Sequence, residues 1–214
     1  MDLATVRLNL SYVLHEPSTS QQVASVARQV IANERKARAA IERLSRLPDA
    51  EILRRVMSPI PLDMLDFPVS ASFVTLQIGA WQLIPRVLAA LQSARGQGRG
   101  VRVPVQFLDN LTGGPTAATP FFRAPAQLRL PAWKPGGAPP RHFVSLILRP
   151  GGEQLQLTLD RLSIDPGSDH ILDVLKASAP PAESIVRSHF GQWFCPRPLW
   201  PQPAEQALPE FQRK

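Results

Sequence analysis

The chain has 214 residues, of which 44% are hydrophobic, with 24 lysines and arginines against 17 aspartates and glutamates, a net charge of +7. This composition excludes a disordered chain and predicts a globular protein that buries a sizeable core. The single cysteine, Cys195, excludes an intrachain disulfide and a cysteine-based zinc site.

The N-terminal part predicts a strand followed by a helical hairpin. Residues 6–14 alternate between apolar and polar side chains, which indicates a half-buried strand. Serine and threonine at 18–20 can cap a long helix, whose apolar residues recur at helical spacing until Pro48. We expect Asp49 to cap a second, short helix that ends near Met57.

A buried strand and a helix are expected next. Residues 69–78 are apolar and rich in β-branched side chains, which favours a strand in the core. A helix should run from Pro85 to Arg95, because proline is favoured at the first helical position and Gly96 can close the last turn.

Residues 101–132 predict two short strands at sheet edges with a loop between them. Residues 101–107 alternate, and Pro104 cannot donate a ladder hydrogen bond, so this strand should lie at an edge. Residues 111–125 are rich in glycine, threonine and proline, which indicates a loop. Residues 126–132 alternate again, and Pro131 indicates a second edge.

A β-hairpin is predicted around Pro150-Gly151-Gly152. The continuously apolar residues 143–148 precede this turn and residues 153–164 follow it, with proline and glycine in the order of a type II turn. The apolar residues of the second strand stand at odd positions up to Leu159 and at even positions from Leu162. We therefore expect a bulge near Asp160 or Arg161, which would keep both sets on one inward face: Leu155, Leu157, Leu159, Leu162 and Ile164.

Two C-terminal helices are expected, one capped by Ser168 or Asp169 and ending near Ala177, and a short one over residues 182–190. Three aspartates lie four residues apart in this region, and three carboxylates can bind a divalent ion. We interpret them as helix-capping residues, because acidic side chains are favoured at helix N-termini: Asp165, Asp169 and Asp173.

The last segment, residues 191–214, has five prolines and no sustained helical or strand period. We expect an extended arm attached to a single domain of residues 1–190, because proline disfavours helix. Trp193, Trp200 and Phe211 are its candidate partner-binding residues, since buried aromatic anchors dominate many interfaces. Folding back on its own domain and docking on a neighbouring subunit are both open.

Positive charge is concentrated in the middle third of the chain, where Asp109 is the one acid among these basic residues: Arg86, Arg95, Arg99, Arg102, Arg123, Arg129, Lys134, Arg141 and Arg149. Such a one-sided field attracts anions. We expect one exposed anion- or nucleic-acid-binding face, formed by Arg95, Arg99, Arg102 and Arg129. The aromatic residues in and beside this stretch could stack on bases, although we interpret them as core residues: Phe107, Phe121, Phe122, Trp133 and Phe143.

The sequence carries no complete catalytic, metal or cofactor signature, and Cys195 has no base at a recognisable spacing. No signal-peptide pattern precedes the first predicted element, and the longest apolar stretch is too short to cross a bilayer, so we expect a cytoplasmic protein without a membrane span.

The expected fold is α+β, with an N-terminal strand, a helical hairpin, a mainly antiparallel sheet, C-terminal helices and the arm. The preferred function is a non-enzymatic binding or assembly protein that uses the basic middle region and the aromatic C-terminal arm to hold macromolecular partners, either other proteins or copies of itself. The alternative is a module that binds single-stranded DNA or RNA on the same basic surface. A third possibility is an enzyme whose site is assembled from residues distant in sequence.

Overall fold

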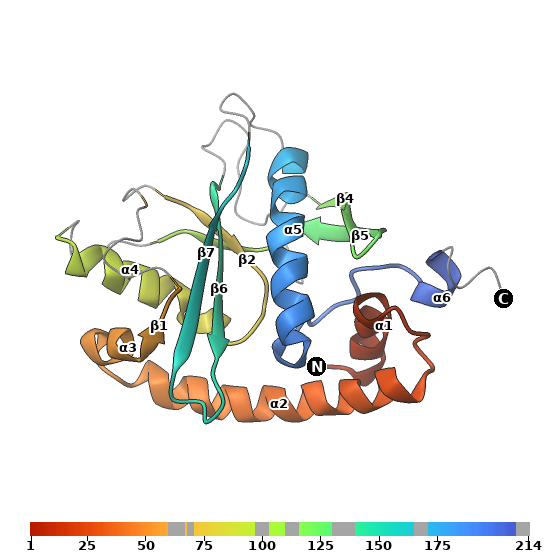
Figure 1. The fold of residues 1–214 in the computed structure, drawn as a ribbon, viewed down its shortest axis with the longest axis horizontal. Helices are drawn as coiled ribbons and strands as arrows, with labels where there is room; N and C mark the ends of the chain where they lie inside the picture. The colour runs from red at the N-terminus through yellow and green to blue at the C-terminus, as the bar shows by residue number, and fades with distance from the viewer. Residues whose placement is uncertain are drawn as a thin grey trace.

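A computed structural model describes residues 1–59, 67, 71–96, 103–109, 116–129, 140–164 and 171–208. A five-stranded mixed sheet with strand order β1-β7-β6-β2-β3 forms its centre (Figure 1). Its strands are β1 (Val56–Met57), β2 (Phe73–Thr75), β3 (Val105–Phe107), β6 (His142–Leu148) and β7 (Leu155–Arg161). A separate two-stranded sheet pairs β4 (Thr116–Phe121) with β5 (Ala124–Arg129).

The helices surround this sheet. They are α1 (Leu3–Leu14), α2 (Gln21–Ser45), α3 (Asp49–Arg55), α4 (Ile84–Ala94), α5 (Ile171–His189) and α6 (Ala204–Ala207), with short 3-10 turns η2 (Trp81–Leu83) and η3 (Phe190–Gln192). Figure 1 shows α2 along the base of the molecule, with α3 and α4 on one side and α1, α5 and α6 on the other. In the described parts of the chain, no helix has the length and apolar character needed to cross a membrane.

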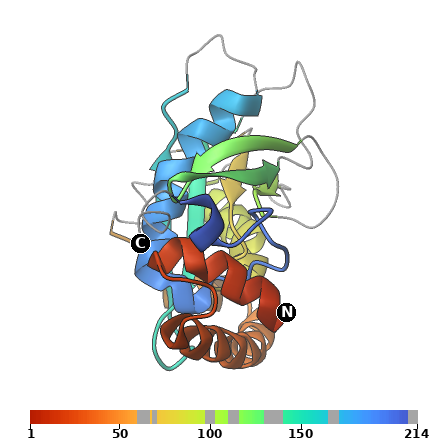
Figure 2. The same ribbon diagram turned by 90° about the vertical axis from the view of Figure 1, so that its right-hand side faces the viewer.

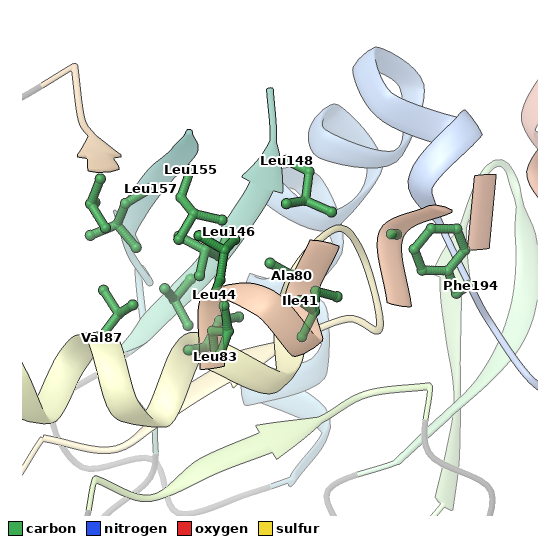
Figure 3. Packing of buried hydrophobic residues seen from close by; sticks show 14 of the residues in the cluster. Ile41, Leu44, Ala80, Leu83, Val87, Leu146, Leu148, Leu155, Leu157 and Phe194 are labelled. Carbon is green, nitrogen blue, oxygen red and sulfur yellow. The ribbon is translucent and has the colours of Figure 1, made fainter. Parts of the chain in front are cut away.

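The hydrophobic core has two parts, to which alternate residues of β6 contribute. Leu146 and Leu148 belong to the first part with residues of α2, α3 and α4, whereas Phe143 and Ile147 belong to the second with residues of α5 and β5. Figure 3 shows the first part, where Leu146 lies beside Leu44 and Leu83 and Leu157 faces Val87 of α4. The sheet is therefore covered on both faces.

The N-terminal segment is a helix, so the prediction of a strand over residues 6–14 is wrong. Asp2 caps α1, because its carboxylate accepts a hydrogen bond from the backbone N–H of Thr5 at 2.9 Å. Val6, Leu10 and Val13 recur at helical spacing and are all buried. Since polar residues between them are buried as well, α1 has no clean polar face, and its sequence alternates like a strand.

The sheet is mixed, so the prediction of a mainly antiparallel sheet is also wrong. β1 pairs with β7, β2 with β3, and β2 with β6 in parallel, while β6 and β7 are antiparallel. The chain runs from β2 through α4 to β3, and such a strand–helix–strand crossover brings consecutive strands into parallel pairing. β3 lies at the sheet edge, as predicted from Pro104.

The predicted hairpin is confirmed, but the predicted bulge is wrong. β6 pairs with β7 continuously from Leu148↔Leu155 to His142↔Arg161. Gly151 has φ +93° and Gly152 donates its N–H to the Arg149 carbonyl at 2.9 Å, as a type II turn requires. Leu155 and Leu157 pack in the first core part, whereas Leu162 and Ile164 pack in the second. The odd-numbered and even-numbered apolar residues therefore lie on opposite faces of the sheet.

A second hairpin, β4–β5, occupies part of the predicted loop at 111–125. Its two-residue turn is Phe122-Arg123, and both residues have positive φ, +49° and +64°. This is the backbone pattern of type I′ turns, which normally use asparagine and glycine, so the sequence gives no turn signal here. Phe122 is fully buried, and the Glu183 carboxylate accepts a hydrogen bond from its N–H at 2.6 Å.

The two predicted C-terminal helices are one continuous helix, α5, which contains Pro180 and Pro181. The prolines remove two backbone donors, but the buried face runs unbroken across them: Val174, Leu175, Ala179, Ala182 and Val186. We infer that packing against β4 and β6 outweighs the lost hydrogen bonds. The predicted caps Ser168 and Asp169 lie outside the described residues.

The remaining helix boundaries agree closely with the sequence. Ser20 caps α2, because its hydroxyl accepts a hydrogen bond from the N–H of Val23 at 3.1 Å. Gly96 follows α4 with φ +72°, the left-handed conformation expected after a helix. Asp49, however, is the first residue of α3 instead of its cap, and its carboxylate pairs with Arg86 at 2.7 Å, which ties α3 to α4.

Candidate anion-binding site

Helix α2 is buried on one face and strongly basic on the other. The buried face packs into the first core part through Val23, Ala27, Val30, Ala37, Ala40, Ile41 and Leu44. Two of the basic residues are paired along the helix, Arg38 with Glu34 at 3.0 Å and Arg46 with Glu42. Four exposed cations remain, and they have no acidic partner among the described residues: Arg28, Arg35, Lys36 and Arg43.

These four residues form a stripe, called the basic stripe below. Their positions, i, i+7, i+8 and i+15, lie within an arc of about 100° on one side of the helix. At 1.5 Å per residue the stripe is about 22 Å long. Figures 1 and 2 both show α2 along the lower boundary of the molecule, with the β6–β7 turn beside it. All four side chains of the stripe are exposed to solvent.

A groove of about 540 Å³ lies between α2 and the β6–β7 turn. Lys36 and Arg43 contribute to it from the helix, and Arg149 contributes from the turn. The groove lining contains no carboxylate: Asn33, Lys36, Ala37, Ala40, Arg43, Leu148, Arg149, Pro150, Gly151, Gly152 and Gln192. Three cations thus surround one hollow without internal neutralisation, an arrangement that favours a bound anion.

The walls of the groove are fixed to each other. The Gln192 side chain bonds both backbone groups of Leu148, accepting from its N–H at 3.1 Å and donating to its carbonyl at 2.8 Å. Asn33 of α2 donates to the Gly191 carbonyl at 3.0 Å. A Cβ at Gly152 would lie 3.1 Å from the Cβ of Ala40, so the turn packs closely on the helix. The groove is preformed, which limits the entropy lost on binding.

A second hollow, of about 190 Å³, differs in its charge. It is lined by Glu34 and Arg38 together with Gln77, Trp81 and Phe194, among others. Here Glu34 neutralises Arg38 and also lies 3.8 Å from the N-terminal amine. Positive charge in this hollow is compensated, so the groove beside the turn is the better anion site.

Neither of the two described residues of the predicted basic face, Arg95 and Arg129, lines the groove. Arg95 lies at the end of α4, a helix of the first core part, with its guanidinium 5.4 Å from the centre of the Phe67 ring. Arg129 ends β5, a strand of the second core part. The structure therefore places these two arginines on different layers. Arg99 and Arg102 lie outside the described residues.

Most of the described aromatic residues of the basic region are buried in the core. Phe121, Phe122 and Phe143 are buried, and Phe107 packs edge-on against Trp81 with ring centres 5.0 Å apart. Trp133 lies outside the described residues. The buried rings agree with their interpretation as core residues and do not offer a surface on which bases could stack.

The C-terminal segment folds back on its own domain. Trp193 and Trp200 are 3% and 1% exposed, so neither presents its ring to a partner in this structure. Trp200 stacks on Tyr12 with ring centres 4.2 Å apart, and the Tyr12 hydroxyl donates to the Gln202 carbonyl. Phe211 lies outside the described residues. Residues 193–208 therefore fold back on their own domain, which is one of the two arrangements left open for the arm.

Asp109 follows β3 and is the buried acid that fastens this segment. Its carboxylate accepts hydrogen bonds from the Gln77 N–H at 3.0 Å and from the Trp193 indole at 3.1 Å. Burial raises the pKa of Asp109 to about 6, and these hydrogen bonds partly oppose the rise. Burial also raises the pKa of the Cys195 thiol, with a further contribution from Asp109, so the thiol is protonated at neutral pH.

Known proteins give no independent guide to this site. No family model matches the chain, and a search of curated proteins finds no match. Within the described ranges, no group of three histidine, cysteine, aspartate or glutamate side chains is placed to hold a metal ion. The basic stripe could be identified in the sequence from the spacing of its cations along the long helix that was predicted there. The higher net charge of the middle third of the chain pointed to a different region.

Proposed function

We propose that this protein is a non-enzymatic binding protein that holds an anionic macromolecular partner on the basic stripe of α2 and the adjoining groove. The observation that carries this proposal is the set of four exposed cations without an acidic partner among the described residues, joined at the groove by Arg149. Charges of one sign along a fixed helix speed the encounter with a partner of opposite sign and orient it.

The arrangement favours a different molecule over a second copy of the chain at this face. Two basic stripes brought together would repel each other, since like charges at an interface are unfavourable. The aromatic C-terminal segment, which could have joined subunits, packs into its own domain through Trp193 and Trp200. The support for binding therefore comes from α2 and the β6–β7 turn.

Retention on immobilised heparin tests this proposal. The variant Arg28→Gln with Arg35→Gln removes two stripe cations, and both side chains are exposed, so the fold should be unchanged. The matched control is Arg161→Gln with Lys176→Gln, which removes two exposed cations from β7 and α5.

We expect the stripe variant to elute at lower salt than both the parent and the control. It loses charges that contact heparin, and salt screens the remaining contacts more easily, whereas the control loses charges away from the stripe. Equal elution of the stripe variant and the control would show that net charge alone causes retention. That result would contradict a binding face on α2.

A further inference from the structure

We propose that the partner is a double-stranded nucleic acid, and that the groove between α2 and the β6–β7 turn holds phosphates of its backbone. This inference rests on the proposed function and names its partner. The charges are those already described: Lys36, Arg43 and Arg149 around the groove, continued along α2 by Arg28 and Arg35.

The spacing of the stripe suits a duplex. Its cations lie at three levels along the helix, separated by seven or eight residues, or about 10 to 12 Å. The major groove of B-form DNA is about 12 Å wide, so neighbouring levels can reach phosphates on both of its sides. A stripe about 22 Å long matches an extended polyanion better than a compact ligand.

The groove suits phosphates better than bases. Its lining contains arginine, lysine, asparagine and glutamine but no aromatic residue. Arginine forks bind phosphate oxygens in pairs, whereas single strands are held by bases stacked on rings. Three described rings of the basic region are buried: Phe121, Phe122 and Phe143. The expected binding is therefore independent of sequence and strongly dependent on salt.

The nearest acids do not cancel this field. Glu42 is engaged by Arg46, and Glu34 lies in the other hollow with Arg38. Glu153 follows the turn and is exposed, but it does not line the groove. Arg149 donates to the side-chain oxygen of Gln156 at 3.2 Å, a contact with a neutral group that leaves its charge available.

The test is fluorescence anisotropy of a labelled 20-base-pair DNA duplex titrated with the full chain between about 0.05 and 0.2 M salt. The groove variant is Lys36→Gln with Arg149→Gln, and the control is Arg161→Gln with Lys176→Gln, which also removes one lysine and one arginine. Unlabelled single-stranded DNA and polyglutamate serve as competitors. Thermal melting of both variants checks the fold.

Each lost phosphate contact lowers affinity about eightfold at 0.1 M salt, because the logarithm of affinity falls with a slope of about 0.9 per contact. We expect the groove variant to bind about 60-fold more weakly than the parent, with a salt slope smaller by about 2. The control should change by less than threefold. Lys36→Gln alone should weaken binding about eightfold, which keeps the test valid if the double variant unfolds.

The outcomes separate this inference from the proposed function. Equal affinities of the groove variant and the control would overturn the phosphate site. Stronger competition by single strands or by polyglutamate than by duplex would overturn the choice of partner and leave an anion-binding face. If the parent binds neither duplex, polyglutamate nor heparin, both proposals fail.

Discussion

Truncating Trp200 should destabilise the protein more than any surface change, because its ring joins α1, β4 and the C-terminal segment. It stacks on Tyr12 with ring centres 4.2 Å apart and planes at 9°, and on Phe121 at 5.8 Å and 10°. Replacing a buried tryptophan with alanine costs about 3–5 kcal/mol, and each lost aromatic pair adds about 0.5–1.5 kcal/mol. We therefore expect Trp200→Ala to lower the free energy of unfolding by about 4–8 kcal/mol.

Urea unfolding followed by far-ultraviolet circular dichroism measures this loss without relying on tryptophan emission. Trp81→Ala is the matched control, because Trp81 is only partly buried and should cost clearly less. Trp200→Phe should recover part of the stability, since it keeps a stacked ring. A loss below about 1 kcal/mol for Trp200→Ala would refute the packed position of the segment and restore Trp200 as a candidate partner anchor.

Three further changes test the fold. Leu157→Ala should lower the free energy of unfolding by about 2–5 kcal/mol in the same urea assay, because Leu157 is fully buried between β7 and the helices; a loss within about 0.5 kcal/mol would contradict its position. Gly79→Ala should cost more than about 2 kcal/mol, since Gly79 has φ +59° and a Cβ there would lie 2.3 Å from the Leu146 carbonyl oxygen; an unchanged melting temperature would rule out this close approach. Asp109 has its pKa raised by burial from 3.8 to about 6, so the folded state keeps a proton that the unfolded state releases, and stability should fall by up to about 3 kcal/mol as pH rises from about 4 to 6. The free-energy difference between Asp109→Asn and the parent should therefore shift in favour of the variant over this range, and a difference independent of pH would show that Asp109 is not sealed from solvent.

Local signals predicted several element boundaries well. The cap at Ser20, the start of α4 beside Pro85 and the Pro150-Gly151 turn each depend on neighbouring residues, so the sequence contains their full cause. Elements whose structure depends on packing against residues distant in sequence were predicted wrongly. Residues 6–14 alternate like a strand but are buried on several sides of a helix. The prolines of α5 stay helical because its buried face packs against β4 and β6.

The candidate site was harder to predict than the fold. Total charge pointed to the middle third of the chain, but Arg86 pairs with Asp49 there, and Arg95 and Arg129 belong to different layers. The cations of α2 were visible in the sequence as a polar helix face. What could not be seen is that Arg149, more than a hundred residues later, returns to that face because the hairpin turn packs on Ala40.

The most direct test of the basic face is a map of its contacts in solution. Titrating ¹⁵N-labelled protein with the 20-base-pair duplex, and separately with a heparin oligosaccharide, reports which backbone amides sense the ligand. We expect chemical-shift changes concentrated in residues 28–46 and 148–152, around the stripe and groove. Shifts confined to the ends of α4 and β5, near Arg95 and Arg129, would contradict it and return the anion site to the middle third of the chain.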